Sequence, residues 1–336
     1  MKRFVTSLVV VTVLVTATVA CTPADQATSA CMTGHPVVTL PVDPGQYLPD
    51  QNVSLPDGTT IDSRLASYDD TTLSQSGHGE AVKIYPEAGS RNGLCFVGGS
   101  ISSSLDDVTV PWSTWHYVTG LTVLTPNFEV VGIKIANQGD AISMSGSGAT
   151  NFKIVGVSAS GGPGSDGAYI HDDCVENDSM NAGLVDDAKF DGCDTFMSSI
   201  ASPGPDGGAN LVEVRNTLVR LQSTYNSYNP AKYGYDQHGG FFKWASVPSR
   251  DGVAPQLYVH DDVFRADSPA HYGGNANGFL ALPPGTRCDH VTLINTQTWP
   301  ASDLASWTSQ CTNVTLGTTA DWNAAVATWN QSHPGL

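Results

Sequence analysis

Ionisable side chains gather in one short segment, IHDDCVEND, which begins at Ile170. The segment contains His171 together with the acidic residues Asp172, Asp173 and Glu176. Histidine and carboxylates transfer protons in acid–base catalysis, and carboxylate oxygens are also the ligands that Ca²⁺ prefers. The segment therefore predicts proton transfer, a Ca²⁺ site formed by Asp172, Asp173 and Glu176, or both.

Three further residues could complete this chemistry. Asp194 lies in the segment GCDTFMS, Lys243 lies in GGFFKWA, and His238 lies in a long segment just before Lys243. We expect Lys243 or His171 to accept a proton and His238 to donate one, with Asp194 on the same surface. The four residues are far apart along the chain, so a particular fold must bring them together.

Tyrosines lie close to these residues in the sequence. Tyr169 precedes the acidic segment, and Tyr235 and Tyr272 lie in two long segments rich in polar residues. Long loops that carry aromatic residues commonly form the walls of a binding site, and aromatic rings suit the C–H faces of sugars. We therefore predict that the three tyrosines bind substrate, and Tyr235 is an alternative proton donor to His238.

Asp172 and Asp173 also have a structural interpretation. Aspartates at strand ends commonly accept hydrogen bonds from backbone N–H groups in turns. The triplet HDD occurs a second time, at residues 260–262, in a segment without other chemically suggestive residues. This second copy favours a turn preference for aspartate, and the sequence leaves both interpretations open.

A repeat in the sequence predicts a fold that could bring these residues together. The segment NFEVVGIKI, from Asn127, is followed by the similar segment NFKIVGVSA, from Asn151, and weaker copies come after them. Each copy is a short alternating apolar run bounded by Gly, Asn, Asp or Pro, which is typical of a strand. Such units bury their apolar faces by stacking on their neighbours. The leucine-rich-repeat skeleton is missing, so the repeat predicts an all-β, parallel β-helix solenoid.

Within this solenoid we expect a second strand in each unit to follow a turn. Aligning GAYIHDD with the earlier segment DAISMSG puts Ile170 inside and turns Tyr169 and His171 toward solvent. The same reasoning buries Phe242 and exposes Lys243. Stacked strands then place Tyr169, His171, Asp194 and Lys243 on one outer face.

The pattern resembles the right-handed parallel β-helix superfamily of pectate lyases and related polysaccharide-active proteins. The resemblance covers residues 82–316 and depends on the repeated NF-x-[VI]-V-G-[IV] segment and on second strands that begin at glycine. It implies a right-handed solenoid and one face that carries Ca²⁺-binding aspartates and an Arg or Lys base.

Three functions stay open. The one expected first is a polysaccharide lyase that cleaves a uronate-containing glycan by β-elimination, with a base for the proton and Ca²⁺ to neutralise the carboxylate. A glycoside hydrolase would instead use paired carboxylates, which HDDCVEND and VDDAKFDGCD supply. A non-catalytic glycan-binding or surface protein would need only the tyrosine-bearing loops that form the walls of a binding site.

The two ends of the chain differ from the repeat. Residues 1–20 combine two basic residues, an apolar run and small residues, as signal peptides do. Cys21 follows directly and resembles the acylated cysteine of bacterial lipoproteins, so we expect a cell-surface lipoprotein anchored there, or a secreted protein. We predict a tether and an N-terminal capping region over 21–80, the β-helix domain over 81–316 and a short C-terminal capping helix over 317–336.

Cysteine and charge content limit the cellular setting and the partners. Six cysteines remain after Cys21, and an even number in an exported chain favours disulfides. Cys288 and Cys311 lie about one coil apart, and Cys174 and Cys193 nearly so, so each pair could bridge stacked strands. The formal net charge of −17 argues against nucleic acid and against electrostatic docking on anionic lipid. We therefore expect a monomer that binds an extracellular polysaccharide and meets the membrane only through a lipid anchor.

Overall fold

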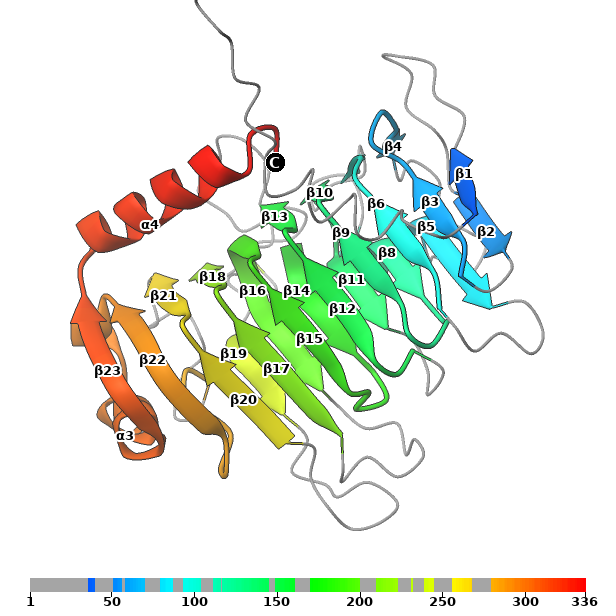
Figure 1. The fold of residues 1–336 in the computed structure, drawn as a ribbon. Helices are drawn as coiled ribbons and strands as arrows, with labels where there is room; N and C mark the ends of the chain where they lie inside the picture. Colours follow the sequence, from blue (N-terminus) through cyan, green and yellow to red (C-terminus); the bar gives the residue numbers. More distant parts are fainter. Residues whose placement is uncertain are drawn as a thin grey trace, which may run out of the picture.

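Strands dominate the fold in Figure 1, which is a computed structural model. The structure describes residues 36–39, 51–55, 58–69, 79–86, 93–103, 111–115, 117–144, 149–160, 170–199, 210–222, 231, 239–244, 256–267 and 279–336. In these ranges 23 strands form one continuous hydrogen-bonded network. Strands that are neighbours in space come from successive units of the chain and pair in parallel.

The strands form three ladders. The first ladder contains β1 (Val37–Thr39), β3 (Thr60–Asp62), β6 (Cys95–Val97), β9 (Glu129–Val131), β12 (Phe152–Val155), β15 (Gly183–Asp186), β17 (Leu211–Arg215), β20 (Gln256–His260) and the first parts of β22 (Arg287–Ile294) and β23 (Cys311–Gly317). The second contains β4 (Ser67–Asp69), β7 (Ser100–Ser102), β10 (Lys134–Ala136), β13 (Ser158–Ser160), the first part of β16 (Lys189–Ser199), β18 (Leu218–Gln222), β21 (Val263–Asp267) and the later parts of β22 and β23. The third contains β2 (Gln51–Leu55), β5 (Gly79–Pro86), β8 (Val118–Val123), β11 (Asp140–Met144), β14 (Ile170–Asn177), the later part of β16 and β19 (Gly240–Trp244). Each coil of the chain visits the ladders in turn, so the protein is a parallel β-helix, and the predicted all-β fold is confirmed.

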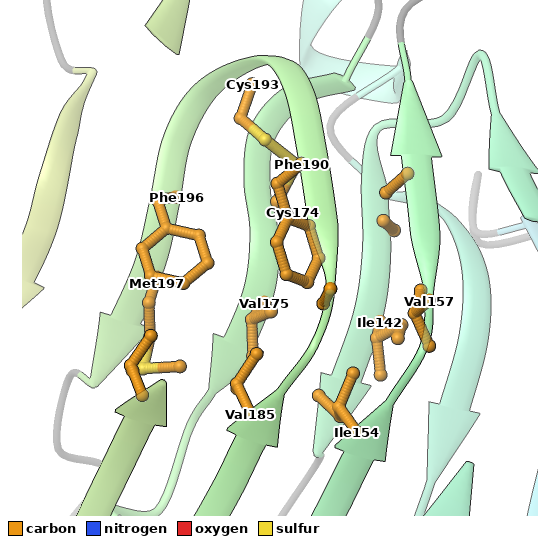
Figure 2. Packing of buried hydrophobic residues seen from close by; sticks show 14 of the residues in the cluster. Ile142, Ile154, Val157, Cys174, Val175, Val185, Phe190, Cys193, Phe196 and Met197 are labelled. Carbon is orange, nitrogen blue, oxygen red and sulfur yellow. A yellow bond between two sulfur atoms is a disulfide. The ribbon is translucent and has the colours of Figure 1, made fainter. Parts of the chain in front are cut away.

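The apolar residues of successive strands stack inside the coil. Ile142 aligns with Val175, and Val175 aligns with Met197; Figure 2 shows all three projecting into the interior from neighbouring strands. All three are fully buried or nearly so, and each such side chain stabilises the fold by about 1.5–3 kcal/mol relative to exposure. This shared interior explains why no single repeat needs to be stable alone.

A left-handed residue makes the turn between the first two ladders. Gly132 and Gly156 have φ of 65° and 58°, and Asp187, Asn216 and Asp261 take the same place in later coils with φ of 51°, 52° and 60°. Glycine adopts this conformation without strain, and Asn and Asp tolerate it better than other residues do. The V-G-[IV] pattern of the repeat is therefore a turn signal, and aspartate or asparagine replaces glycine in the later coils.

The second HDD triplet belongs to this turn. Asp261 is the left-handed residue, and Asp262 points into the coil, where its carboxylate accepts a hydrogen bond of 2.7 Å from the N–H of Thr217. Asp262 is 1% exposed, and this burial raises its pKa well above the usual range. The turn preference inferred for aspartate holds for this copy, whereas the first copy lies inside strand β14.

Helix α3 (Ala301–Gln310) packs beside the last coils and was not predicted. Its carboxylate, hydroxyl and amide oxygens accept hydrogen bonds from three backbone N–H groups: Asp303 from Leu280, Ser306 from Leu282 and Gln310 from Gly285. Trp307 of the same helix is fully buried and donates its indole N–H to the carbonyl of Leu280. The side chains of α3 thus replace hydrogen bonds that a further strand would make.

The C-terminal helix is confirmed as α4 (Thr319–Ser332), within the expected range 317–336. It begins with a capping box between Thr318 and Asp321. Figure 1 shows it lying across the solenoid beside β21, β18 and β13. Trp322 and Trp329 pack in a cluster with residues of the second ladder, and the indole N–H of Trp329 donates to the carbonyl of Asp187. The helix therefore covers the outer face of the second ladder.

Both expected disulfides are present. Cys174 in β14 bonds Cys193 in β16, and Cys288 in β22 bonds Cys311 in β23. Cys95 is also disulfide-bonded. Disulfides of this kind are typical of an oxidising, extracellular environment.

The N-terminal part of the chain is described only in segments. Strands β1 to β4 lie within the range 21–80, which the sequence assigns to a tether and cap, and β1 and β3 already belong to the first ladder. The predicted signal peptide and Cys21 lie outside the described residues. In the part of the chain that the structure describes, no helix is long and apolar enough to cross a membrane.

Candidate functional site

Two columns of polar positions run along the third ladder, on either side of its inward-facing residues. The Glu176 column consists of Lys83, Thr122, Ser143, Glu176, Ser198 and Lys243, aligned strand by strand from β5 to β19. The Asp173 column consists of Glu80, Thr119, Asp140, Asp173, Thr195 and Gly240, on the same strands. Neighbouring positions in a column are about 4.8 Å apart, so each column spans about 24 Å over six strands.

Asp173 links three strands of this ladder. Its backbone N–H donates a hydrogen bond of 3.1 Å to the carboxylate of Asp140 on β11. Its own carboxylate forms an ion pair of 3.3 Å with Lys243, two strands away on β19. The side chain of Asp173 is 5% exposed and that of Lys243 is 21% exposed. An ammonium group this close to a carboxylate stabilises the ionised form of both groups.

Glu176 has a different environment, although it is only three residues from Asp173. Burial, the negative charge of Asp178 and that of Asp173 together raise the pKa of Glu176 to about 8, while a hydrogen bond from Ser143 opposes the shift. At neutral pH the carboxyl group of Glu176 is therefore mostly protonated. The residue is half-buried, so it can meet a substrate.

The turn after β14 holds Asp178 next to Glu176. Asn177 is fully buried; its amide nitrogen donates to the carbonyl of Asn181, and its amide oxygen accepts from the N–H of Asn181, both at 2.9 Å. These hydrogen bonds close a tight turn over residues 177–181. Asp178 sits in that turn, which explains why a second carboxylate lies beside Glu176.

The structure gives the expected catalytic residues different surroundings. Lys243 and Asp173 meet directly, as described above. His171 is only 5% exposed, so the expectation that it faces solvent is wrong; its backbone N–H donates to the carbonyl of Gln138. Asp194 is fully buried, and Gly239 packs so closely on it that a Cβ there would lie 2.8 Å from its carboxylate carbon.

The expected strand alignment is also wrong. A constant repeat implied that Ile142 would align with a residue of GAYIHDD, but it aligns with Val175, which comes after that segment. At this point of the third ladder, aligned residues are therefore further apart along the chain than one repeat. On the first ladder Lys153 aligns with Glu129. Lys153 follows Glu129 by the same number of residues as Asn151 follows Asn127, so this ladder keeps the spacing of the repeat. The predicted burial of Phe242 is confirmed, whereas Lys243, which was expected to be exposed, is only 21% exposed because it lies against Asp173.

Several predicted residues lie outside the part that the structure describes. They are Tyr169, Tyr235, His238, Tyr272 and Cys21, and the side chain of Asp172. Their expected roles stay predictions. Across the described ranges no group of three or more His, Cys, Asp or Glu side chains is arranged to hold a metal ion. The Ca²⁺ site expected at Asp172, Asp173 and Glu176 also stays a prediction, because it includes Asp172.

Sequence reasoning missed three contributors to this site: Asp140, Ser143 and Asp178. Asp140 and Ser143 lie in DAISM, which the repeat marked as a plain strand. Only the true alignment of β11 with β14 shows that they meet Asp173 and Glu176. Asp178 is visible in the acidic segment itself, where its closeness to Glu176 in the sequence is the signal that could have been used.

A disulfide fixes the strands that carry these groups. Cys174 follows Asp173 on β14, and Cys193 precedes Asp194 on β16. The pairing of the two strands is irregular between Ile170 and Asp173. The covalent bond holds the strands together at this irregularity, and Figure 2 shows it at the end of the stacked apolar residues.

Comparisons with protein-family models, with curated proteins and with solved structures find no match to this chain. The chemistry of the site must therefore be inferred from its own geometry.

Proposed function

We propose that the protein is an extracellular glycoside hydrolase in which Glu176 is the general acid and Asp173 the general base. The observation that carries the proposal is the contrast between two neighbouring carboxyl groups. Glu176 lies beside Asp178 and keeps its proton, with its pKa raised to about 8, whereas Asp173 lies beside Lys243. Pairs of carboxyl groups whose environments push their pKa values apart are typical of acid–base catalysis.

The roles follow from the protonation states. Glu176 donates its proton to the glycosidic oxygen as the bond from that oxygen to the anomeric carbon breaks. Asp173 accepts a proton from a water molecule, whose oxygen forms the new bond to the anomeric carbon. Lys243 holds the carboxylate of Asp173 in an ion pair of 3.3 Å.

Activation of water by Asp173 implies inversion of the anomeric carbon. Three residues along a strand place the Cα atoms of Asp173 and Glu176 at most about 10 Å apart, an upper limit that includes the carboxyl separations of both inverting and retaining enzymes. The expectation of a product of inverted configuration therefore follows from the proposed roles, and NMR of the fresh product tests it.

The shape of the site supports a polymeric sugar. The partly exposed positions of the two columns are Glu80, Lys83, Glu176 and Lys243, whereas most of the other positions are buried. These four groups are spread from β5 to β19, which suits an extended chain better than a small compact ligand. Trp244 is half-buried next to Lys243, and it packs edge-on against Phe242 and on the hydrophobic core. The likeness of the repeat to the pectate-lyase superfamily supports the same substrate type at the level of the fold.

The setting proposed with this activity is outside the cell. The two disulfides on described strands and the signal-like residues 1–20 support export, with Cys21 as the proposed lipid anchor. We propose a monomer, because each ladder is completed by strands of a single chain.

A polysaccharide lyase is the second candidate. The observation in its favour is Lys243, whose ammonium group lies half-buried in the Glu176 column and could bind a substrate carboxylate or, once deprotonated, abstract a proton. The hydrolase is preferred because the ion pair with Asp173 stabilises the protonated form of Lys243, which cannot act as a base.

Product chemistry separates the two reactions. The mature protein is incubated with neutral and with uronate polysaccharides, and new reducing ends and ultraviolet absorbance are followed. New reducing ends without absorbance support hydrolysis, whereas absorbance from an unsaturated product would establish the lyase and refute our proposal.

Substitution of the acid tests its role. Glu176→Gln should lower the rate by about 10²–10⁴-fold, the usual contribution of a general acid. The matched control is Glu129→Gln, which removes a carboxylate of the first ladder that pairs with Lys153 at 3.6 Å and lies outside both columns. Equal rates for wild type and Glu176→Gln, on any glycan that is cleaved, would exclude Glu176 as the acid.

A further inference from the structure

The C-terminal end of helix α4 is attached to the turn between β15 and β16. The indole N–H of Trp329 donates a hydrogen bond of 3.0 Å to the carbonyl of Asp187, a residue of this turn. Lys189, at the start of β16, donates one of 2.7 Å to the side chain of Asn330. Its ammonium group also lies 4.5 Å from the centre of the Trp329 ring. These polar contacts fix the last turn of the helix on the second ladder.

His333, which ends α4, completes this attachment. Its ring is buried, with only 2% of the residue exposed. Nε2 lies 3.1 Å from the carboxylate of Asp187, and Nδ1 lies 3.0 Å from the carbonyl of Trp329. Both partners are acceptors, so a ring that carries a proton on each nitrogen satisfies both. The ring also stacks on Trp329 at 4.1 Å, an arrangement that favours a cation.

A neutral His333 ring fits this place less well, because it has only one N–H. If Nδ1 keeps the proton, the lone pair of Nε2 faces the carboxylate of Asp187. If Nε2 keeps it, the lone pair of Nδ1 faces the carbonyl of Trp329, and the hydroxyl of Ser332, 3.0 Å away, would have to donate to it. That hydroxyl would then give up its own hydrogen bond of 2.9 Å to the same carbonyl. Either neutral form weakens the attachment.

The solenoid presents charges of both signs to His333. Asp187 favours the charged ring and Lys189 opposes it, whereas Gly156, in the turn between β12 and β13, is the uncharged neighbour on which the ring packs. Burial of the ring also opposes its charge, but the hydrogen bonds to Asp187 and to the carbonyl of Trp329 outweigh burial and raise the pKa of His333. The charged form is therefore the one that the folded protein stabilises.

We infer that His333 is a pH-sensitive latch: when protonated it holds the last turn of α4 on the Asp187 turn, and loss of its proton releases that turn. Release would uncover Leu218, which aligns with Lys189 and packs in one cluster with Trp329. The other end of α4 stays in place, because its capping box and the buried Trp322 do not involve His333. The inference does not depend on the proposed reaction.

Hydrogen exchange followed by NMR on the full mature chain tests the latch between pH 5 and pH 9. The probes are the indole N–H of Trp329 and the backbone N–H of His333, which donates to the carbonyl of Trp329. After correction for the intrinsic pH dependence of exchange, opening at both probes should increase by about tenfold, the effect of one charge-assisted hydrogen bond. The backbone N–H of Trp322, in the first turn of α4, should show no such increase.

Three variants assign the change to its groups. His333→Gln should make opening independent of pH, because glutamine has no proton to lose. Ser332→Ala removes the hydroxyl that could donate to the neutral ring, so it should enlarge the pH effect by about two- to fivefold. The control is His290→Gln, which removes an exposed histidine that pairs with Asp289 on β22; it should leave the transition unchanged.

The ring C–H resonance of His333, followed in the same samples, gives the midpoint of its titration. Coincidence of this midpoint with that of opening in the wild type supports the latch even where a variant fails to fold, and different midpoints overturn it. Constant opening from pH 5 to pH 9 also overturns it. A transition that persists in His333→Gln belongs to Lys189, whose own pKa is lowered by burial, and would overturn the assignment to His333.

Discussion

At the scale of single residues, the surroundings of each carboxyl group decide its role. Glu176 and Asp173 have the same functional group and lie three residues apart, yet one adjoins a carboxylate and the other an ammonium group. Like charge favours the neutral form and opposite charge favours the ionised form. The contrast therefore depends on two neighbours, Asp178 and Lys243, and each can be changed separately.

Activity should fall as the pH rises through about 8, because Glu176 then loses the proton that it must donate. Asp178→Asn removes a negative charge that raises the pKa of Glu176, so this alkaline limb of the pH–rate profile should move to lower pH. The measurement is the initial rate of hydrolysis across the pH range. Glu129→Gln, on the first ladder, should leave the limb in place; an unmoved limb in Asp178→Asn would contradict the assignment.

At the scale of elements, side chains complete hydrogen bonding wherever the repeat stops. Helix α3 lies beside the last coils, and its Asp303, Ser306 and Gln310 accept hydrogen bonds from backbone N–H groups. Unpaired strand edges invite aggregation, and polar side chains of a helix can satisfy an edge without adding a strand. The helix thus contributes to stability mainly through a few buried hydrogen bonds and Trp307.

Asp303→Ala should lower the free energy of unfolding by about 1–3 kcal/mol, because it leaves the buried N–H of Leu280 without its acceptor. Denaturant unfolding measures the change. The control is Ser309→Ala on the exposed side of the same helix, for which we expect a change within about 0.5 kcal/mol. Equal effects of the two substitutions would mean that the Asp303 contact contributes nothing specific.

At the scale of the whole molecule, several buried groups bind protons more tightly in the folded chain than in the unfolded chain. The pKa of Glu176 is raised from 4.5 to about 8, and burial raises the pKa of Asp262 well above its usual range. The pKa of His333 is also raised, because hydrogen bonds to Asp187 and to the carbonyl of Trp329 outweigh its burial. All three shifts have the same sign, so their effects on stability add.

A raised pKa contributes stability that is complete below the unfolded value and is lost as the pH rises through the folded value. The melting temperature should therefore fall between about pH 5 and pH 9. Asp262→Asn should make this fall shallower, since asparagine has no proton to lose. Thermal unfolding followed by circular dichroism gives the curve; a melting temperature that rises over this range would refute the protonation states given above.

Much of the fold could be predicted because its signals are local. The spacing between Asn127 and Asn151 reflects one coil, and both residues are left-handed, with φ of 52° and 57°. Cysteine spacing indicated which strands are bridged. Helix α3 was missed because the sequence after β22 offered no apolar periodicity as clear as the tryptophan spacing of α4.

The candidate site could be predicted only in part. The sequence singled out both Lys243 and Asp173, which form an ion pair, but the exposure of His171 was wrong, and Asp140 and Ser143 were not recognised. The physical reason is the alignment of the third ladder, where β11 and β14 are further apart along the chain than one repeat, whereas β9 and β12 of the first ladder keep the repeat spacing. The segments between strands vary in length, so a constant repeat cannot show which residues of this ladder face each other.

The sequence by itself determined that short parallel strands would stack, since alternating apolar runs between turn residues have no other way to bury their surface. Only the tertiary structure decided which polar side chains became neighbours, because backbone hydrogen bonds across the ladder set that alignment and chain order does not. The protonation of Glu176 follows from this alignment and from the turn that holds Asp178 against it.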